Sequence, residues 1–430
     1  MKNLLPTLLP HLKATRLPGF DLGDHAVLPG YHGQALSNLP GSVCQWLRTP
    51  PLAAPLAETY HQELDDHFQH VVVIVADGMG IHLLQEVLAA DPVIGQGPNV
   101  WQRLLDDALL APLTSIVPST TAAALTTLWT GRTPLEHGII GYELWLKEYG
   151  LIANMISHAP ASFSSDLDGL RRAGFQPENF LPLPRLGSHL LANGVASYAF
   201  QPASIAHSGL SRMILTDVNV VPYRTQSDLW VSLKGLLLSK TLERTYTYVY
   251  WGSVDELGHR FGPQDERIQL ECTAFGVQLE QFLAAYRRVR RQNTLFLLTA
   301  DHGQIATPPR PEYDLKNHPA LLACLAMMPS GENRLPYLFL RPGAEETARQ
   351  YIQETWPGQF RLFPASQVMQ SGLLGDGPMY PAVADRLGDW VAIPQDNAYW
   401  WWANKPNTLQ GRHGGLSEAE MLVPLMAFVV

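Results

Sequence analysis

Carboxylate and imidazole side chains follow closely after several apolar runs of this sequence, where they are well placed to bind divalent metal ions. The candidates are Asp77, Asp255, His259, Asp301, His302 and His413. Each alone has an ordinary structural explanation, because an aspartate before a glycine commonly closes a turn. Oxygen and nitrogen ligands without thiolates nevertheless suit divalent ions. The set as a whole therefore predicts a centre that holds two of them.

A pair of threonines, Thr120 and Thr121, precedes a run of small residues that ends at Gly131. This pattern predicts a helix with a threonine at its N-terminus and a glycine at its C-terminus. The hydroxyl is either a plain helix cap or a group beside free backbone N–H groups, in a position suited to a phosphoryl group. Threonine becomes a nucleophile at neutral pH when a metal ion lowers its pKa.

Three buried strands are expected to position these groups. Residues 71–76 are a continuous apolar run, which is the pattern of a strand covered on both faces of a parallel sheet, and residues 246–251 and 294–300 are further buried strands in which threonines are the only polar residues. Asp77 and Asp301 follow the first and the last of them. Because open α/β sheets bind ligands at the carboxyl ends of their strands, we expect an α/β fold with its site along that edge.

Changes of pattern along the chain predict its domain organisation. We expect an N-terminal arm, largely extended with a few short turns and packed on the core, over residues 1–60. The core comprises residues 61–304 and 396–430, with helices near 81–90 and 265–290. Between its two parts lies a small inserted αβ subdomain, residues 305–395, with strands at 336–340 and 360–363 and a helix at 344–355.

Composition excludes several classes of protein. The chain of 430 residues is 46% hydrophobic and 16% charged, so it folds rather than remaining disordered. Its formal charge of −9 and the lack of a long basic run argue against a nucleic acid polymer as partner. No apolar run reaches the roughly 18 residues of a membrane span. Three widely separated cysteines and no signal peptide predict a cytoplasmic protein.

Several common catalytic motifs are absent from the sequence. Gly78 and Gly80 begin like a dinucleotide fingerprint, but Leu83 occupies the position of its third glycine. No Walker A, H-E-x-x-H or G-x-S-x-G motif occurs. Nucleotide cofactors and serine-hydrolase chemistry are therefore disfavoured.

Five motifs in order resemble the alkaline phosphatase superfamily, in particular its type I phosphodiesterase and nucleotide pyrophosphatase branch. They are Asp77-Gly78, the segment 118–138, the segment 255–262, the segment 299–303 and His413-Gly414-Gly415. The resemblance implies a three-layer α/β/α sandwich with a mostly parallel central sheet. It also implies a hydrolase of phosphoric esters, with phosphodiesters or nucleotide pyrophosphates as the expected substrates.

The same resemblance assigns roles within the site. One ion is expected on Asp77, Thr121, Asp301 and His302, and the other on Asp255, His259 and His413. Both ions are expected to be Zn²⁺, with Mn²⁺ as the alternative. Thr121 takes the nucleophile position and is expected to form a phosphothreonine intermediate, while the backbone N–H of Ala122 binds the substrate.

Other functions remain open at this stage. The chain has Ala124 where the resemblance leads us to expect an asparagine that holds a phosphoryl oxygen. A phosphomutase, a phosphomonoesterase or a phosphonate hydrolase on the same scaffold is one alternative, and an inactive metal-binding protein that binds a partner is another. Trp400, Trp401 and Trp402 either stack on a substrate or pack in the core. The expected partner is a small phosphorylated substrate, and the chain is expected to be a monomer or a homodimer.

Overall fold

Apolar runs form a central eight-stranded sheet in the computed structural model, which describes residues 2–62, 64, 67–90, 99–163, 165–240, 243–289 and 293–430. In spatial order its strands are β1 (Lys2–Asn3), β3 (Leu109–Thr114), β16 (Leu422–Val429), β9 (Thr294–Thr299), β2 (His70–Ala76), β8 (Thr245–Trp251), β6 (Ala196–Pro202) and β7 (Asn219–Tyr223). Only β16 runs antiparallel to its neighbours. The predicted, mostly parallel sheet is confirmed.

The register of the three central strands decides where their carboxyl ends lie. Val75 of β2 pairs with Tyr250 of β8 on one side and with Thr299 of β9 on the other. Asp77 lies two residues after Val75, and Asp301 lies two residues after its partner Thr299. The two aspartates therefore follow the sheet at the same level. All three strands are buried along their whole length, as their largely apolar sequences predict.

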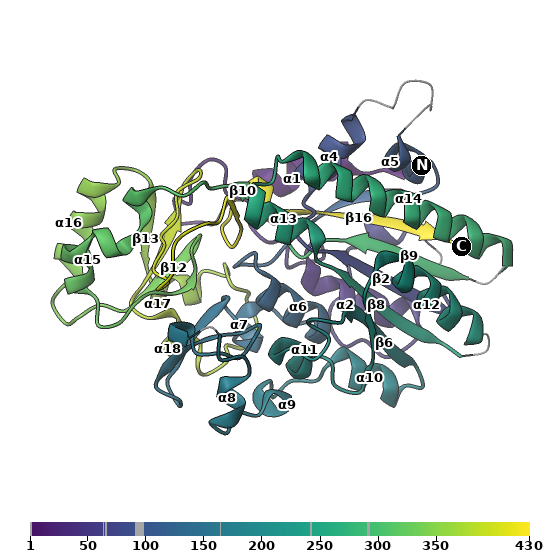
Figure 1. Cartoon of the computed structure of the whole chain (residues 1–430), viewed down its shortest axis with the longest axis horizontal. Helices are drawn as coiled ribbons and strands as arrows, with labels where there is room; N and C mark the ends of the chain where they lie inside the picture. Colours follow the sequence, from purple (N-terminus) through teal and green to yellow (C-terminus); the bar gives the residue numbers. More distant parts are fainter. Residues whose placement is uncertain are drawn as a thin grey trace.

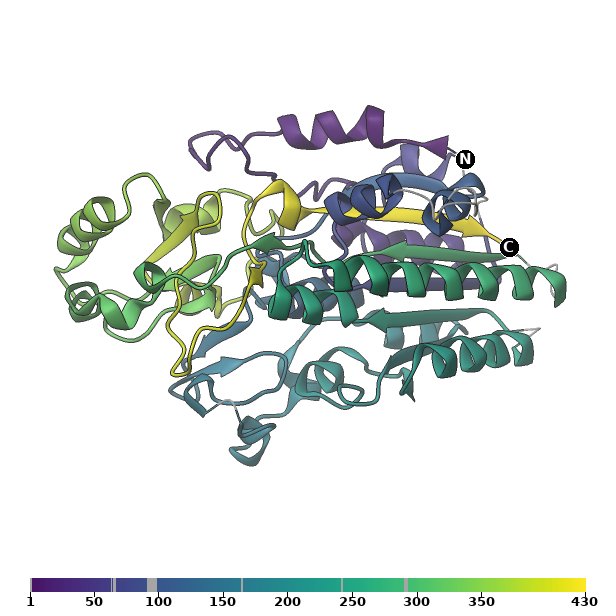
Figure 2. The ribbon, with the colours of Figure 1, turned by 45° about the horizontal axis from the view of Figure 1, so that its top comes forward.

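Helices cover both faces of this sheet and give the predicted three layers (Figures 1 and 2). On one face the helices are α4 (Ile81–Ala89), α5 (Val100–Asp106), α12 (Gln226–Ser239) and α14 (Glu266–Val289). On the other they are α2 (Leu39–Trp46), α6 (Thr121–Thr130), α10 (Leu186–Ala192) and α11 (Gly209–Ile214). The long α14 lies across the sheet in Figure 2 and buries one stripe of side chains, among them Phe275 and Leu279.

A second, antiparallel sheet lies beside the carboxyl edge of the first. Its strands in spatial order are β13 (Phe360–Pro364), β14 (Trp390–Pro394), β12 (Leu335–Leu338), β11 (Ser330–Glu332), β4 (Glu143–Leu146) and β5 (Leu151–Asn154). The expected strands near 336–340 and 360–363 are present, as is the helix α16 (Glu345–Thr355). β4 and β5 come from an earlier part of the chain, and they tie this sheet to the core. The division into domains stays a prediction.

Shorter elements complete the fold. The remaining helices are α1 (Leu5–Ala14), α3 (Glu58–His61), α7 (Pro134–His137), α8 (Gly169–Arg172), α9 (Pro177–Phe180), α13 (Ser253–Phe261), α15 (Pro319–Cys324), α17 (Ala365–Gln370), α18 (Val383–Leu387) and α19 (Glu418–Met421). A small ribbon pairs β10 (Ile305–Ala306) with β15 (Gly411–Arg412). Among the described residues, no helix is both long enough and apolar enough to cross a membrane.

The expectation of a largely extended N-terminal arm is wrong for two stretches. Residues 5–14 form α1, which buries Leu5, Leu8 and Leu12 on one stripe, and α2 is buried along most of its length. Pro6 stands in the first turn of α1, where a proline costs no hydrogen bond. The many prolines and glycines in this region obscured the helical spacing of its leucines. Packing against the core stabilises these helices.

Candidate active site

The N-terminus of α6 presents a threonine to the carboxyl edge of the central sheet. Thr120 is the N-cap residue, but its side chain makes no capping hydrogen bond, and Thr121 is the first helical residue. The first amide of this turn to find a backbone acceptor is that of Ala124, which bonds to Thr120 O. Among the described residues none accepts a hydrogen bond from the amide of Ala122. That N–H is therefore available to an anion at the positive end of the helix.

Asp77, Asp301 and His302 form the first ligand group, deep beneath Thr121. Each offers one ligand atom within 4.8 Å of the others. His302 Nε2 lies 3.3 Å from Asp77 Oδ1, 3.5 Å from Asp301 Oδ2 and 3.1 Å from Thr121 Oγ1. These are the four residues expected around one ion, and the structure brings all of them together.

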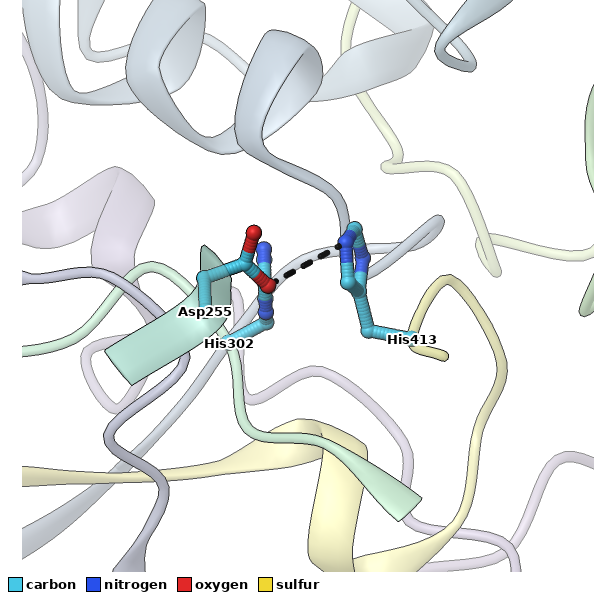
Figure 3. Close-up of side chains that lie close together, drawn as sticks. All are labelled: Asp255, His302 and His413. Atoms are coloured by element: carbon cyan, nitrogen blue, oxygen red, sulfur yellow. Dashed lines mark ion pairs between the residues drawn. The ribbon is translucent and has the colours of Figure 1, made fainter. Parts of the chain in front are cut away.

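Asp255, His259 and His413 are the residues expected on the second ion, and we call them the second ligand group. The ligand atoms that lie within 4.8 Å of one another here belong to Asp255, His302 and His413, so His302 is shared between the two groups and His259 lies outside this set. Helix α13 carries the first two residues one turn apart, which places His259 Nε2 3.3 Å from Asp255 Oδ2. His413 follows β15, and its Nε2 lies 3.7 Å from Asp255 Oδ1, as the dashed line in Figure 3 shows. The rings of His413 and His302 stack with centroids 3.6 Å apart, so the two groups are adjacent.

The three histidines share one hydrogen-bonding arrangement. Nδ1 of His259, His302 and His413 faces a backbone carbonyl oxygen, those of Gly411, Gly303 and Ser119 respectively, at 2.9–3.1 Å. A carbonyl can only accept, so each Nδ1 carries a proton, and each Nε2 faces the carboxylates. A hydrogen bond of this kind at Nδ1 fixes the tautomer of metal-binding histidines.

In each carboxylate of the first group, one oxygen lacks a donor. Asp77 Oδ1 and Asp301 Oδ2 are buried and accept no hydrogen bond from any described residue. Burial, together with the charges of Asp301 and Asp255, raises the pKa of Asp77 well above its usual value, and burial and Asp255 raise the pKa of Asp301 to about 6.

His302 and His413 supply no compensating positive charge. Burial lowers the pKa of His302 to about 4, and burial and His302 lower the pKa of His413 to about 3. Neutral imidazoles facing unpaired carboxylate oxygens leave a deficit of positive charge that divalent ions would fill. The donor set therefore fits the expected metal ions.

The structure shows where the residues that the sequence linked to substrate contacts lie. Ala124, in place of the expected asparagine, is fully buried in α6. Trp400 and Trp401 are buried in an aromatic core of the second sheet. Only Trp402 is partly exposed, and its indole N–H donates to Glu143 Oε2 at 2.9 Å.

Glu332 at the end of β11 is a neighbour of the site that sequence reasoning missed. Its Oε1 accepts the N–H of Tyr142 at 2.7 Å, and its side chain packs against Gly414, next to His413. Burial raises the pKa of Glu332 to about 8 although Thr120 faces the carboxyl group. An isolated glutamate in an inserted strand carries no local signal that it reaches the site.

Two further missed residues are Tyr250 and Gln304, which donate hydrogen bonds to Asp77 and Asp255. A tyrosine in a buried strand is usually a core residue, so its pattern is uninformative. Gln304 follows the Asp301-His302-Gly303 motif directly, and this adjacency was the one signal that could have revealed it.

The three-layer fold, with both ligand groups at the carboxyl edge and a threonine at a helix N-terminus, defines an alkaline-phosphatase-like phosphoesterase. The chain belongs to the type I phosphodiesterase / nucleotide pyrophosphatase family, whose model matches residues 71–415. It is accordingly a hydrolase that acts on phosphoric esters. A comparison with curated proteins finds no match.

Solved structures share the fold at low sequence identity. Murine ectonucleotide pyrophosphatase / phosphodiesterase 5 is similar with a TM-score of 0.61 and 16% identity, over 83% of this chain and 87% of that chain. Its human counterpart has a TM-score of 0.59 and 12% identity over the same shares. Phosphonoacetate hydrolase from Sinorhizobium meliloti 1021 has a TM-score of 0.55 and 15% identity, over 83% and 89%.

Proposed function

We propose that this chain hydrolyses phosphodiesters or nucleotide pyrophosphates through a phosphothreonine intermediate at Thr121, with two divalent ions, Zn²⁺ in the first place and Mn²⁺ as the alternative. One observation carries the proposal: the hydroxyl of Thr121 stands at the N-terminus of α6, 3.1 Å from His302 Nε2 and beside the first ligand group. When bound, the ions would lower the pKa of this hydroxyl and offset the charge of the phosphoryl oxygens.

The residues of the chain would then act in two displacements. Thr121 Oγ1 attacks phosphorus, a new O–P bond forms, and the bond to the leaving-group oxygen breaks. Water then cleaves the phosphothreonine ester, which returns Thr121 and releases the phosphoryl product. The free N–H of Ala122 is placed to donate to a phosphoryl oxygen in both steps, where a backbone donor stabilises developing charge.

A monoanionic diester suits the groups around Thr121 better than a dianionic monoester. The described ion pairs of the two ligand groups involve histidines and no lysine or arginine. The second negative charge of a monoester would therefore find no guanidinium clamp to hold it.

Hydrolysis assays with the Zn²⁺- or Mn²⁺-loaded chain test the proposal. We expect bis(p-nitrophenyl) phosphate to be hydrolysed faster than p-nitrophenyl phosphate. A tenfold preference for the monoester would contradict the diester assignment, turnover of phosphonoacetate alone would favour a phosphonate hydrolase, and inactivity on every ester would favour a binding role.

Substitution of the nucleophile tests the intermediate. Thr121→Ala should lower kcat by about three orders of magnitude or more with the ions still bound, while Thr121→Ser keeps measurable activity. Mass spectrometry of acid-quenched enzyme should find the phosphoryl adduct on Thr121. Thr120→Ala is the matched control. Activity that survives in Thr121→Ala but disappears in Thr120→Ala would move the nucleophile by one residue.

The location and assembly of the chain are also proposals. Cys44, Cys272 and Cys324 are buried free thiols, which supports a reducing cytoplasm. A monomer or a homodimer that binds a small phosphorylated molecule, without a nucleic acid polymer, stays our expectation. Size-exclusion chromatography with light scattering measures the assembly directly.

A further inference from the structure

Each ligand group contains one aspartate that is held from outside by a neutral side chain. In the first group the hydroxyl of Tyr250 donates to Asp77 Oδ2. In the second group the carboxamide of Gln304 donates to Asp255 Oδ1 at 2.5 Å and to the backbone oxygen of Asp255 at 3.1 Å. Both donors lie outside the ligand set that the sequence predicts.

The position of Tyr250 follows from sheet register. Tyr250 pairs with Val75 across β8 and β2, and Asp77 lies two residues beyond Val75, so the phenol and the carboxylate are diagonal neighbours. The bond occupies Oδ2 of Asp77, whereas Oδ1 accepts no hydrogen bond and lies 3.3 Å from His302 Nε2. Tyr250 thereby determines which oxygen faces the ligand group. Burial and the charge of Asp77 raise the pKa of Tyr250 well above its usual value, so the phenol stays a donor.

Gln304 reaches Asp255 beside Gly258, a position of helix α13 that has no side chain. A Cβ atom at Gly258 would collide with the carboxamide of Gln304, so a side chain at this position would displace the carboxamide. Gly258 lies between Asp255 and His259 in the sequence. One turn of α13 thus carries two candidate ligands, Asp255 and His259. It also carries the glycine beside which the side chain of Gln304 reaches Asp255.

We propose that Tyr250 and Gln304 are positioning residues, each of which raises the affinity of one ligand group for its ion by holding the aspartate in the binding orientation. This inference rests on the two-ion centre of the proposed function. Partners of this kind that orient metal ligands typically change metal affinity by about 10–100-fold when they are removed. Because the two donors serve different groups, their removal should affect different ions.

The chain offers a matched control for the first donor. Tyr248 lies two residues before Tyr250 in β8, is fully buried, and its hydroxyl has no hydrogen-bond partner among the described residues. Tyr248→Phe removes the same atom from the same face of the same strand. A purely structural effect of losing a buried hydroxyl would therefore appear in both variants.

Calorimetric titration of Zn²⁺ into the metal-depleted full-length chain tests the proposal. Tyr250→Phe should weaken one of two binding steps by about 10–100-fold, Gln304→Met should weaken the other, and the double variant should weaken both. Tyr248→Phe should bind like the unsubstituted chain. The melting temperatures of the metal-depleted variants should match that of Tyr248→Phe, which separates metal affinity from folding. Co²⁺ absorption spectra should change in the two positioning variants and not in the control.

The possible failures are distinguishable. An unsubstituted chain that takes up no divalent ion overturns the two-ion centre and this inference with it. Two tight steps in the unsubstituted chain, retained unchanged in Tyr250→Phe and Gln304→Met, overturn this inference alone. Equal weakening of both steps by either single variant contradicts the assignment of one donor to one group.

Discussion

The two ligand groups differ in how far they are enclosed. In the first group the side chains of Asp77, Asp301 and His302 are 4%, 0% and 0% exposed. In the second group Asp255 and His259 are 16% and 27% exposed, and His413 is 10% exposed. The first group stands on the ends of two central strands, whereas the second combines a surface helix with a loop after β15.

This difference suggests a division of labour between the groups. An ion in the first group would lie beneath the hydroxyl of Thr121, shielded from solvent. An ion in the second group would be more open to solvent. Solvent access controls both exchange and the acidity of bound groups at such sites.

Substitution of one aspartate in each group should have the largest effect. We expect Asp301→Asn and Asp255→Asn each to lower kcat by about three orders of magnitude or more, because in-line displacement uses both ions. Elemental analysis after gel filtration should find about one ion per chain in each variant. Full retention of two ions in both variants would show that these carboxylates are not ligands.

A chelator should remove the ions of the two ligand groups at different rates. With excess chelator, the Zn²⁺-loaded chain should release one ion per chain at least about tenfold faster than the other, because the second group is more open to solvent. Hydrolytic activity should fall with the fast phase. Release in a single phase, or activity that follows the slow phase, would contradict the comparison.

A buried histidine outside the site should give the smallest effect. His158 packs against Phe175, and neither of its ring nitrogens has a hydrogen-bond partner among the described residues. Burial lowers its pKa to about 4. In the unfolded chain the imidazole of His158 has a pKa near 6.5, so between pH 6.5 and pH 4 it is protonated there and neutral in the folded chain. The contribution of His158 to the free energy of unfolding is therefore complete above about pH 6.5 and decreases as the pH falls toward 4.

Urea unfolding of the metal-depleted chain at pH 5 and pH 7.5 measures this contribution. His158→Leu removes the titrating ring, so the loss of stability between the two pH values should be about 2 kcal/mol smaller than in the unsubstituted chain. An unchanged pH difference would show that His158 is not the group responsible.

Local patterns in the sequence were sufficient for the strands of the core and for the chemical types of the site. β2, β8 and β9 are recognisable because each is mostly apolar, and a parallel sheet buries both faces of its strands. The run of small residues before Gly131 likewise predicted α6, whose last residue is followed by that glycine in the left-handed conformation. The helices α1 and α2 were missed because their stability comes from packing against the core.

Only the tertiary structure decided which oxygen and nitrogen atoms face one another. The level at which Asp77 and Asp301 leave the sheet depends on the pairing of Val75 with Thr299, more than two hundred residues away in the sequence. Tyr250 and Glu332 reach the site through sheet register and through the second sheet, and neither carries a local signal. Sequence periodicity reports which face of an element is buried, whereas long-range packing sets what that face meets. The sequence by itself therefore determined the chemistry available to this protein, and the fold determined its geometry.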